Sequence, residues 1–290
     1  MYSFCSNYDS KRSTKSISVE KGKSILDRIT KEYSIDSVMT FGGEPLLYPD
    51  STIGILNYAK ELGIPSRQII TNAFWTNNKS KIDEICLALE KAEVNNILIS
   101  IDYFHNEKLN YNIVEYSIAR LLTTKLKGIQ LHPCWFESSE GDNQFDNKTR
   151  ELLNYFSQKY NIKISRGNVL FPAGRALENF PNRFKTISNI NEIDCKILPY
   201  TDKPDKIESI CINPYGIIDS LCTDEMEVDD FLENYNPYRD KIMEMFLNEG
   251  IEKVLLYAEE LSIDFDITEY YSVCDACRDL RQEIKRIKRN

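Results

Sequence analysis

The feature that most constrains the fold is a regular alternation of short apolar runs with helix-like patterns through roughly the first two thirds of the chain. Strands are expected at 37–41, 67–71, 96–101, 128–131 and 162–165, with a further short strand near 169–171. Helices are expected at 18–31, 50–62, 79–92, 114–126 and 147–160. Such alternation predicts right-handed βαβ units and a parallel sheet. The number of successive units favours an α/β fold of the partial (β/α)6, TIM-like barrel type.

The pattern changes near Pro181, which predicts two domains at 1–180 and 181–290. In the second domain, Asn213-Pro214-Tyr215-Gly216 is a strong turn signal and predicts a β-hairpin over 208–222. Helices are expected at 238–247, at 251–261 and from about Val273. The second domain is therefore expected to be a small α+β C-terminal extension.

Composition excludes several classes of protein. The 290 residues carry a net charge of −9, which argues against a general nucleic-acid binder. No apolar run approaches the ~20 residues that span a membrane, and the first residues lack a signal-peptide pattern. We therefore expect a cytoplasmic protein without a membrane partner. In a reducing compartment, the eight cysteines are expected to be thiols or metal ligands rather than disulfides.

Polar residues follow the predicted strands, where the chemistry of such barrels resides. They are Gly42, Gly43 and Glu44 after the first strand, Asn72 after the second, Ser100, Asp102 and His105 after the third, His132 after the fourth, and Arg166 and Asn168 after the fifth. The two histidines are candidates for substrate contact or proton transfer. The alternative for each is a structural hydrogen bond to a neighbouring loop.

The string Phe41-Gly42-Gly43-Glu44-Pro45-Leu46-Leu47 is the most specific in the chain. Paired glycines let the backbone approach a ligand closely and adopt conformations that other residues avoid. Glu44 supplies an acceptor beside them, and Pro45 fixes the exit of the chain. The combination suits the binding of an ammonium group. The alternative is a tight βα turn with a solvated glutamate.

This string resembles the Gly-Gly-Glu-Pro motif of radical S-adenosylmethionine (radical SAM) enzymes, which holds the amino group of the cofactor. Thr71-Asn72, Ser100-Ile101-Asp102 and the stretch from Asn168 to Ala176 resemble further segments of that family, so that the resemblance covers most of residues 5–180. It implies S-adenosylmethionine as a cofactor and a partial (β/α)6 barrel. The cofactor-binding residues that it implies are Gly42, Gly43, Glu44, Pro45, Asn72, Ser100, Asp102, Asn168, Gly174 and Arg175.

The family's [4Fe-4S] cluster is held by three cysteines in the spacing Cys-x3-Cys-x2-Cys, because thiolates suit iron–sulfur clusters. Here Cys5 stands about where the third cysteine belongs, and Tyr2 stands at the place of the second. The first barrel strand, expected upstream of the cluster loop, is also missing. Two interpretations remain. The chain is a fragment or starts late, or it is a degenerate paralogue.

The C-terminal cysteines form a second constellation. Cys274 and Cys277 have a spacing that lets both sulfurs face one metal. Together with Cys195, Gly216 and Cys222 they resemble the twitch/SPASM extension of the family, which implies an auxiliary [4Fe-4S] cluster. A zinc site is the rival, and ordinary buried thiols are the third possibility. Of the other cysteines, Cys211 is expected in the core, and Cys86 and Cys134 are expected in the core or a pocket.

The resemblance implies an enzyme that reductively cleaves S-adenosylmethionine to a 5′-deoxyadenosyl radical and takes its electron from an external donor. Relatives with auxiliary clusters modify peptides, so a peptide or protein substrate is expected. The alternative is a catalytically inactive protein that binds S-adenosylmethionine or a peptide. A third hypothesis is a non-functional fragment with an open sheet edge.

Overall fold

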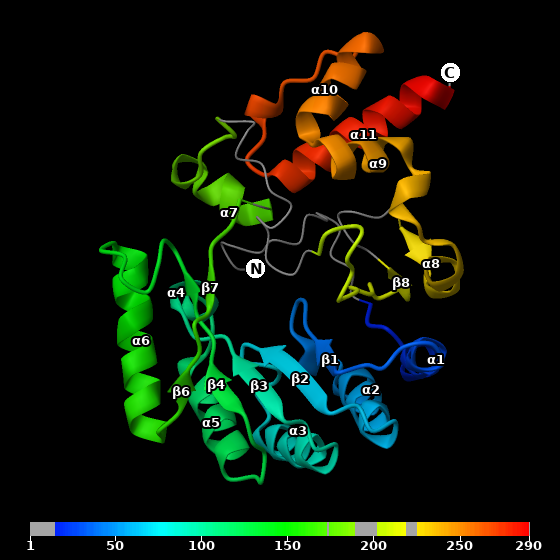
Figure 1. Cartoon of the computed structure of the whole chain (residues 1–290). Helices are drawn as coiled ribbons and strands as arrows, with labels where there is room; N and C mark the ends of the chain where they lie inside the picture. The colour runs from blue at the N-terminus through cyan, green and yellow to red at the C-terminus, as the bar shows by residue number, and fades with distance from the viewer. Residues whose placement is uncertain (1–14, 173, 189–201, 219–224, 290) are drawn as a thin grey trace. The chain divides into compact units, whose positions relative to one another are not determined.

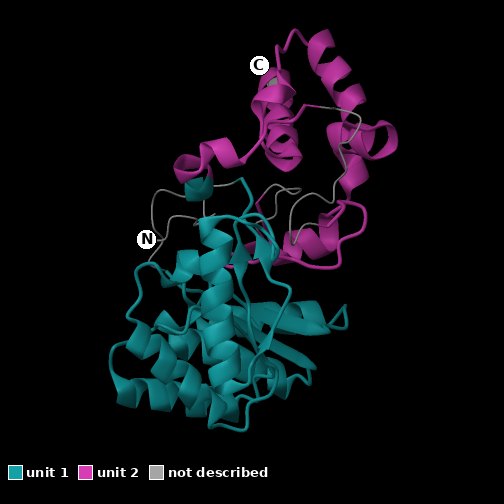
Figure 2. Ribbon diagram, turned by 90° about the vertical axis from the view of Figure 1, so that its left-hand side faces the viewer, with its two compact units in different colours: residues 1–176 teal, residues 177–290 magenta. Residues whose placement is uncertain are grey.

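A computed structural model describes residues 15–172, 174–188, 202–218 and 225–289. The chain divides into two compact units, Met1–Ala176 and Leu177–Asn290, which Figure 2 colours separately. Within the described ranges, no helix is long and apolar enough to cross a membrane.

The first unit is built on a five-stranded parallel sheet in the order β1-β2-β3-β4-β6 (Figure 1). Its strands are β1 Ser37–Thr40, β2 Ser66–Thr71, β3 Asn96–Ile99, β4 Ile129–Leu131 and β6 Lys163–Ile164. A second, two-stranded parallel sheet pairs β5 Cys134–Trp135 with β7 Asn168–Val169. The predicted α/β fold with a parallel sheet is confirmed. Because every strand runs the same way, all carboxyl ends meet at one edge of the sheet.

The helices of this unit connect the strands, and several of them begin at a residue that caps the helix. They are α1 Val19–Thr30, α2 Pro49–Glu61, α3 Lys79–Lys91, α4 Tyr103–Asn106, α5 Tyr111–Leu122 and α6 Gln144–Tyr160, with a 3-10 turn at Pro45–Leu47 (η1). The helix α7 Gly174–Asn179 runs across the boundary between the units, and the 3-10 turn η2 Pro181–Arg183 belongs to the second unit. The side chains of Ser18, Asn78 and Asn143 accept hydrogen bonds from the first turns of α1, α3 and α6. These caps fix where each helix starts.

The core of the first unit lies between the sheet and its helices. Ile69 of β2 and Ile97 and Ile99 of β3 are fully buried. Against them pack side chains at helical spacing from α3 and α5, among them Ile82, Leu89, Ile118 and Leu121. The sheet that carries the polar edge is therefore rigidly supported.

Two strands differ from expectation in their burial. The sequence predicts a buried strand at 37–41, but Ser37 of β1 is exposed and the rest of the strand is half-buried. Among the described strands, β1 pairs only with β2, and an edge strand has less cover than a central one. The other edge, β6, is shorter than predicted, and both of its residues are exposed.

The second unit contains mainly helices. They are α8 Val228–Asn234, α9 Lys241–Glu249, α10 Ile251–Glu260 and α11 Val273–Arg289, with 3-10 turns η4 Pro237–Arg239 and η5 Ile267–Glu269. The predicted turn is present, because the Gly216 N–H donates to the Asn213 carbonyl across 2.9 Å. After the turn, β8 Ile217–Ile218 pairs antiparallel with β9 Met226–Glu227. The core of this unit includes Ile251, Val254, Ala276, Leu280 and Ile284.

Cys211 corrects one prediction. Hairpin alternation beside Ile212 predicts a core thiol, but Cys211 is exposed. An isolated antiparallel bridge joins the next residue, Ile212, to Ile218. Cys86 is fully buried in α3 and belongs to the core, the first of its two predicted places.

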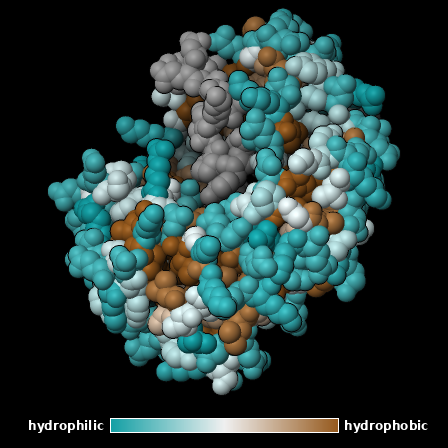
Figure 3. Space-filling view, turned by 60° about the horizontal axis from the view of Figure 1, so that its bottom comes forward, coloured by the Kyte–Doolittle hydropathy of each residue, from teal (hydrophilic) through white to brown (hydrophobic). Residues whose placement is uncertain are grey.

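The surface carries apolar patches among polar residues, as the face in Figure 3 shows. Three exposed apolar side chains flank the Gly42–Pro45 turn in sequence, namely Phe41 (50% exposed), Leu47 (58%) and Tyr48 (40%). Single exposed apolar residues are ordinary, but several in one short stretch are typical of a contact surface.

Candidate functional site

The turn after β1 places Glu44 at the carboxyl edge of the sheet. Gly42 has a φ of +90° and Gly43 a φ of +58°, a region that favours glycine. Among the described residues, no atom lies within 4 Å of a Cβ built on either glycine. Glu44 then caps η1, since its Oε1 accepts a hydrogen bond from the Leu46 N–H at 3.1 Å, and Pro45 fills the first position of that turn.

The Glu44 carboxylate joins the ends of two strands. Its Oε1 accepts a hydrogen bond from Thr71 Oγ1 at 2.8 Å, and its Oε2 accepts one from the Asn72 N–H at 2.7 Å. Thr71 ends β2, and Glu44 is only 7% exposed. A solvated glutamate, the alternative interpretation of this motif, is therefore wrong.

Burial dominates the titration of Glu44. Removal from water raises its pKa from 4.5 to about 7, although hydrogen bonds from Asn72, Thr71 and Leu46 and the charge of His105 lower it. A buried carboxylate with such a pKa is stabilised by a cation placed beside it. The open space over Gly42 and Gly43 leaves room for backbone approach by a ligand. A carboxylate in this setting can hold an ammonium group, as the predicted S-adenosylmethionine site requires.

The segment after β2 is held by its own polar groups. The Asn72 side-chain oxygen accepts a hydrogen bond from the Phe74 N–H at 2.8 Å, and the Ala73 N–H donates to Thr71 Oγ1 at 3.1 Å. Ala73 has a φ of +59°, which is uncommon outside glycine. On the next strand, Ser100 is buried and its N–H donates to the Thr71 carbonyl at 2.8 Å. The residues predicted to follow β2 and β3 thus lie on adjacent strand ends.

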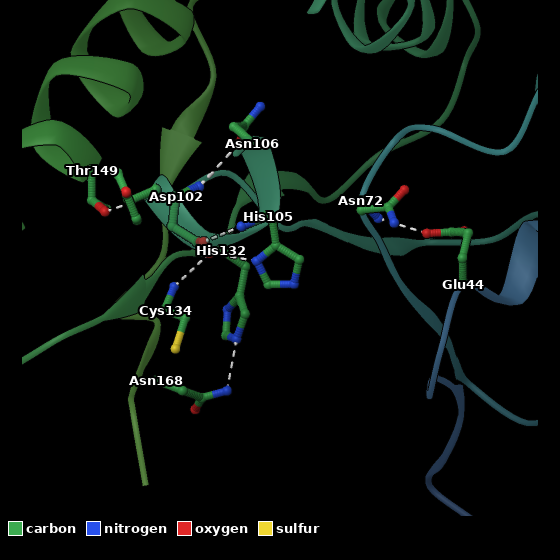
Figure 4. A network of polar contacts seen from close by, with 10 residues as sticks. Glu44, Asn72, Asp102, His105, Asn106, His132, Cys134, Thr149 and Asn168 are labelled. Atoms are coloured by element: carbon green, nitrogen blue, oxygen red, sulfur yellow. Dashed lines mark hydrogen bonds and ion pairs between the residues drawn. The ribbon is translucent and has the colours of Figure 1, made fainter. Parts of the chain in front are cut away.

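Asp102 is a fully buried carboxylate at the end of β3. Its Oδ1 accepts a hydrogen bond from the His105 backbone N–H at 2.8 Å and caps the short helix α4. Its Oδ2 lies 2.6 Å from His105 Nδ1 and also accepts the Cys134 N–H at 2.9 Å. Asp102 therefore fixes the His105 ring and ties the end of β3 to β5 (Figure 4).

His132 is held on both ring nitrogens. Its Nε2 accepts a hydrogen bond from the Asn168 side-chain amide at 3.2 Å, so the ring proton is assigned to Nδ1, which donates to Ser165 Oγ at 2.8 Å. Burial lowers the pKa of His132, with a further lowering by His105 and an opposing effect of Asp102. Through these two hydrogen bonds His132 connects the end of β4 to the segment that leads into β7.

A buried aspartate shapes the loop that follows β5. Asp146, in the first turn of α6, accepts hydrogen bonds from the backbone N–H groups of Phe136 at 2.6 Å and Glu137 at 2.9 Å. Its Oδ2 also accepts the Asn143 side-chain amide at 2.7 Å. Nearby, Thr149 Oγ1 accepts the Tyr103 N–H at 3.0 Å, which anchors α4 beside α6.

The structure brings most of the predicted polar residues to one edge of the sheet. Figure 4 shows Glu44 and Asn72 on one side of the network, with Asp102, His105 and His132 on the other. The charge of His105 affects the pKa of both Glu44 and His132, which places the imidazole within electrostatic reach of each. Gly174, with a φ of +51°, and Arg175 lie in the first turn of α7, and their roles stay predictions.

The predicted metal ligands are only partly described. Cys5, Cys195 and Cys222 lie outside the described residues. Cys274 and Cys277 lie in α11, each partly exposed. Among the residues that the structure describes, no group of three or more histidine, cysteine, aspartate or glutamate side chains is placed to hold a metal ion.

Sequence analysis missed three members of this network. Ser165, Asp146 and Thr149 make contacts with residues far from them in sequence or in another element. Only Asp146 had a usable signal, because an Asn143 cap followed three residues later by an acid is typical of a helix start. The cap also explains why α6 begins at Gln144 rather than at Asn147.

One comparison with known proteins is consistent with the motif in the turn after β1. A search of curated proteins found no match to the chain. Residues 3–124 match the family model of the Radical SAM superfamily, a range that includes Glu44, Asn72, Asp102 and His105. The match supports the superfamily for this part of the chain, and we therefore describe the first unit as radical SAM-like.

Proposed function

We propose that the chain binds S-adenosylmethionine at the carboxyl edge of the sheet in its first unit, which we take to be a partial (β/α)6 barrel. The observation that carries the proposal is the buried Glu44 carboxylate beside two open glycines. A zwitterionic amino acid group needs an anionic partner for its ammonium, and Glu44 is that partner. Burial makes a charge-assisted hydrogen bond to the carboxylate stronger than it would be in water.

We call the turn Gly42–Pro45 the cradle. Its other residues and those around it have distinct tasks in this proposal. Gly42 and Gly43 let backbone carbonyls approach the ammonium, and Pro45 holds the turn. Asn72, Ser100 and the segment containing Asn168, Gly174 and Arg175 surround the rest of the cofactor. The match to the superfamily over residues 3–124 supports the part of this arrangement that precedes β4.

The second candidate function is that of a radical enzyme that cleaves S-adenosylmethionine, and the same match to the superfamily favours it. A [4Fe-4S] cluster supplies the electron that cleaves S-adenosylmethionine in such enzymes. Of the three cluster cysteines, the printed sequence has only Cys5 near the expected place. The residues present do not supply the thiolates of that cluster, so we derive no step through it. An auxiliary cluster on Cys195, Cys222, Cys274 and Cys277 remains part of this second candidate.

A peptide or protein partner fits the first candidate and the second. The exposed Phe41, Leu47 and Tyr48 flank the cradle in sequence, and apolar side chains so placed suit contact with a peptide. The radical reaction would also need an external electron donor. We place the protein in the cytoplasm, where reduced thiols and such donors occur.

Equilibrium binding of S-adenosylmethionine to the full chain tests the first candidate. Glu44→Gln keeps the size and the acceptor oxygen but removes the charge, and we expect its affinity to fall by roughly 10- to 100-fold. Glu84→Gln changes an exposed glutamate of α3 and serves as the matched control. Equal affinity in Glu44→Gln and Glu84→Gln, or no saturable binding in the wild type, would rule out the proposal.

Anaerobic reconstitution with iron and sulfide tests the second candidate. A cluster in the second unit predicts about four irons per chain, lost in Cys274→Ala and retained in Cys86→Ala, whose thiol lies in the core of the first unit. Production of 5′-deoxyadenosine under reducing conditions would establish the enzyme. If the wild type holds no more iron than the background and does not cleave S-adenosylmethionine, the second candidate is excluded and the binding protein remains.

A further inference from the structure

The Glu44 carboxylate accepts hydrogen bonds from three groups, and one of them is a side chain. The Leu46 N–H and the Thr71 hydroxyl reach its Oε1 at 3.1 Å and 2.8 Å. The Asn72 N–H reaches its Oε2 at 2.7 Å (Figure 4). Backbone amides only donate hydrogen bonds, so both carboxylate oxygens act as acceptors, as suits the ionised form. Of these three donors, the Thr71 hydroxyl is the one that a substitution can remove while the backbone stays the same.

The Thr71 hydroxyl is oriented by its own surroundings. Thr71 is the last residue of β2 and is 2% exposed. Its backbone carbonyl accepts a hydrogen bond from the Ser100 N–H at 2.8 Å, which fixes the residue against the end of β3. Its Oγ1 accepts the Ala73 N–H at 3.1 Å. Because an ionised Glu44 only accepts hydrogen bonds, the hydroxyl proton of Thr71 points to the carboxylate.

We propose that Thr71 is a positioning residue for the cradle, whose hydroxyl keeps the Glu44 carboxylate oriented and ionised for an ammonium ligand. A hydrogen bond donated to the charged form of a carboxyl group stabilises that form relative to the protonated one. The same bond ties the carboxylate to the end of β2. The proposal rests on the proposed function, because the ammonium group of S-adenosylmethionine is the ligand for which the carboxylate is held.

Burial and hydrogen bonding act on Glu44 in opposite directions. Burial raises its pKa to about 7, while the hydrogen bonds from Asn72, Thr71 and Leu46 lower it. Among the described residues, His105 of α4 is the charged group that acts on Glu44, and it also lowers the pKa. Both forms of the carboxyl group are therefore populated near neutral pH. Without the Thr71 hydroxyl, we expect the pKa of Glu44 to rise by about one pH unit.

Titration of the Glu44 carboxyl group measures the role of Thr71 without any ligand. Carbon-13 NMR of protein labelled at the glutamate carboxyl carbons follows the signal of Glu44, which is assigned by its loss in Glu44→Gln. We expect a midpoint of about 7 in the wild type. The midpoint should lie about one pH unit higher in Thr71→Val and close to the wild type in Thr71→Ser, which keeps the hydroxyl. An unchanged midpoint in Thr71→Val would overturn the proposal.

Thr52 provides the matched control. It is 6% exposed, and its hydroxyl donates to the Pro45 carbonyl at 2.7 Å rather than to a carboxylate. Thr52→Val therefore removes a buried hydroxyl that contacts the same turn, and the Glu44 midpoint should stay at the wild-type value. An equal rise in Thr52→Val and Thr71→Val would contradict the proposal. If Thr71→Val does not fold, Thr71→Cys decides by the same midpoint, because a thiol is only a weak donor.

The affinity for S-adenosylmethionine at two pH values distinguishes positioning from a merely structural role. A rise of about one pH unit leaves roughly tenfold less ionised Glu44 at pH 6 but only about twofold less at pH 8. We therefore expect Thr71→Val to bind about tenfold more weakly than the wild type at pH 6 and about twofold more weakly at pH 8. Equal losses of affinity at the two pH values would assign Thr71 a structural role and overturn the proposal.

These outcomes separate the inference from the proposed function. The midpoints are measured without ligand, so they hold or fail whether or not S-adenosylmethionine binds. Saturable binding together with an unchanged midpoint in Thr71→Val would overturn the inference alone. Absence of binding in the wild type, together with a raised midpoint in Thr71→Val, would overturn the proposed function and leave Thr71 as the residue that favours the charge of Glu44.

Discussion

The Glu44 carboxylate accepts a hydrogen bond from the backbone N–H of Asn72 across 2.7 Å, and this contact ties the carboxyl end of β1 to that of β2. Thr71 supplies a second donor to the same carboxylate. The carboxylate is nevertheless buried enough that its pKa rises to about 7. Its charge is therefore costly without a cation beside it, and a bound cation offsets that cost.

Glu44→Gln should remove a pH dependence of stability. The folded chain keeps the Glu44 proton up to about pH 7, whereas the unfolded chain loses it near 4.5. The folded state thus binds more protons in that window, and the free energy of unfolding falls by up to about 3 kcal/mol as pH rises through it. Urea unfolding at several pH values measures the slope. Glu84→Gln should keep the wild-type slope, and an unchanged slope in Glu44→Gln would contradict the assignment.

Gly42→Ala should weaken S-adenosylmethionine binding more than it weakens the fold. Gly42 and Gly63 both have positive φ and open space where a Cβ would stand. Alanine should therefore cost about 1 kcal/mol of stability at either position. Only Gly42 lies in the cradle, so ligand affinity should drop in Gly42→Ala and stay at the wild-type value in Gly63→Ala. A comparable drop in both variants would assign the effect to the backbone alone.

His132→Gln should make the chain less sensitive to mild acid. Burial lowers the pKa of His132 below its usual 6.5, so the unfolded chain binds a proton there that the folded chain does not. The contribution of neutral His132 to stability is therefore lost as pH falls below about 6.5. Thermal unfolding between pH 7 and 5 should show a shallower decline for His132→Gln. Parallel declines in the two proteins would indicate that His132 titrates normally.

Asp146→Ala should destabilise the loop after β5. The carboxylate accepts hydrogen bonds from Phe136, Glu137 and Asn143, and its removal leaves those donors without their acceptor. We expect a loss of about 3 kcal/mol in the free energy of unfolding. Asp142→Ala, at an exposed residue of the same loop, should cost less than about 0.5 kcal/mol. Similar losses in both variants would show that the buried hydrogen bonds of Asp146 do not contribute to the free energy of unfolding.

Local signals in the sequence account for much of the fold. Apolar spacing and caps such as Ser18 define α1, and Gly63 follows α2 with a φ of +74° as expected of a helix end. The polar residues after the strands could also be predicted, because parallel strands bring their carboxyl ends to one edge. Glu44 and Asn72 meet there for that reason.

Long-range packing accounts for what the sequence did not predict. The exposure of β1 depends on which strands lie beside it, and the exposure of Cys211 depends on how the second unit packs around its turn. Neither is encoded in local alternation of apolar residues. Ser165 lies 33 positions from His132, so no local pattern could pair them. Burial of the Glu44 carboxylate likewise arises only when the ends of β1 and β2 come together.

The most direct test of the account compares S-adenosylmethionine with an analogue that lacks only its amino group, each titrated calorimetrically into the wild type and Glu44→Gln at pH 8. At that pH the Glu44 carboxyl is mostly ionised. We predict that the amino group strengthens binding to the wild type by roughly tenfold or more, and that this advantage disappears in Glu44→Gln. An amino-group advantage of the same size in both proteins would contradict the claim that Glu44 holds the ammonium.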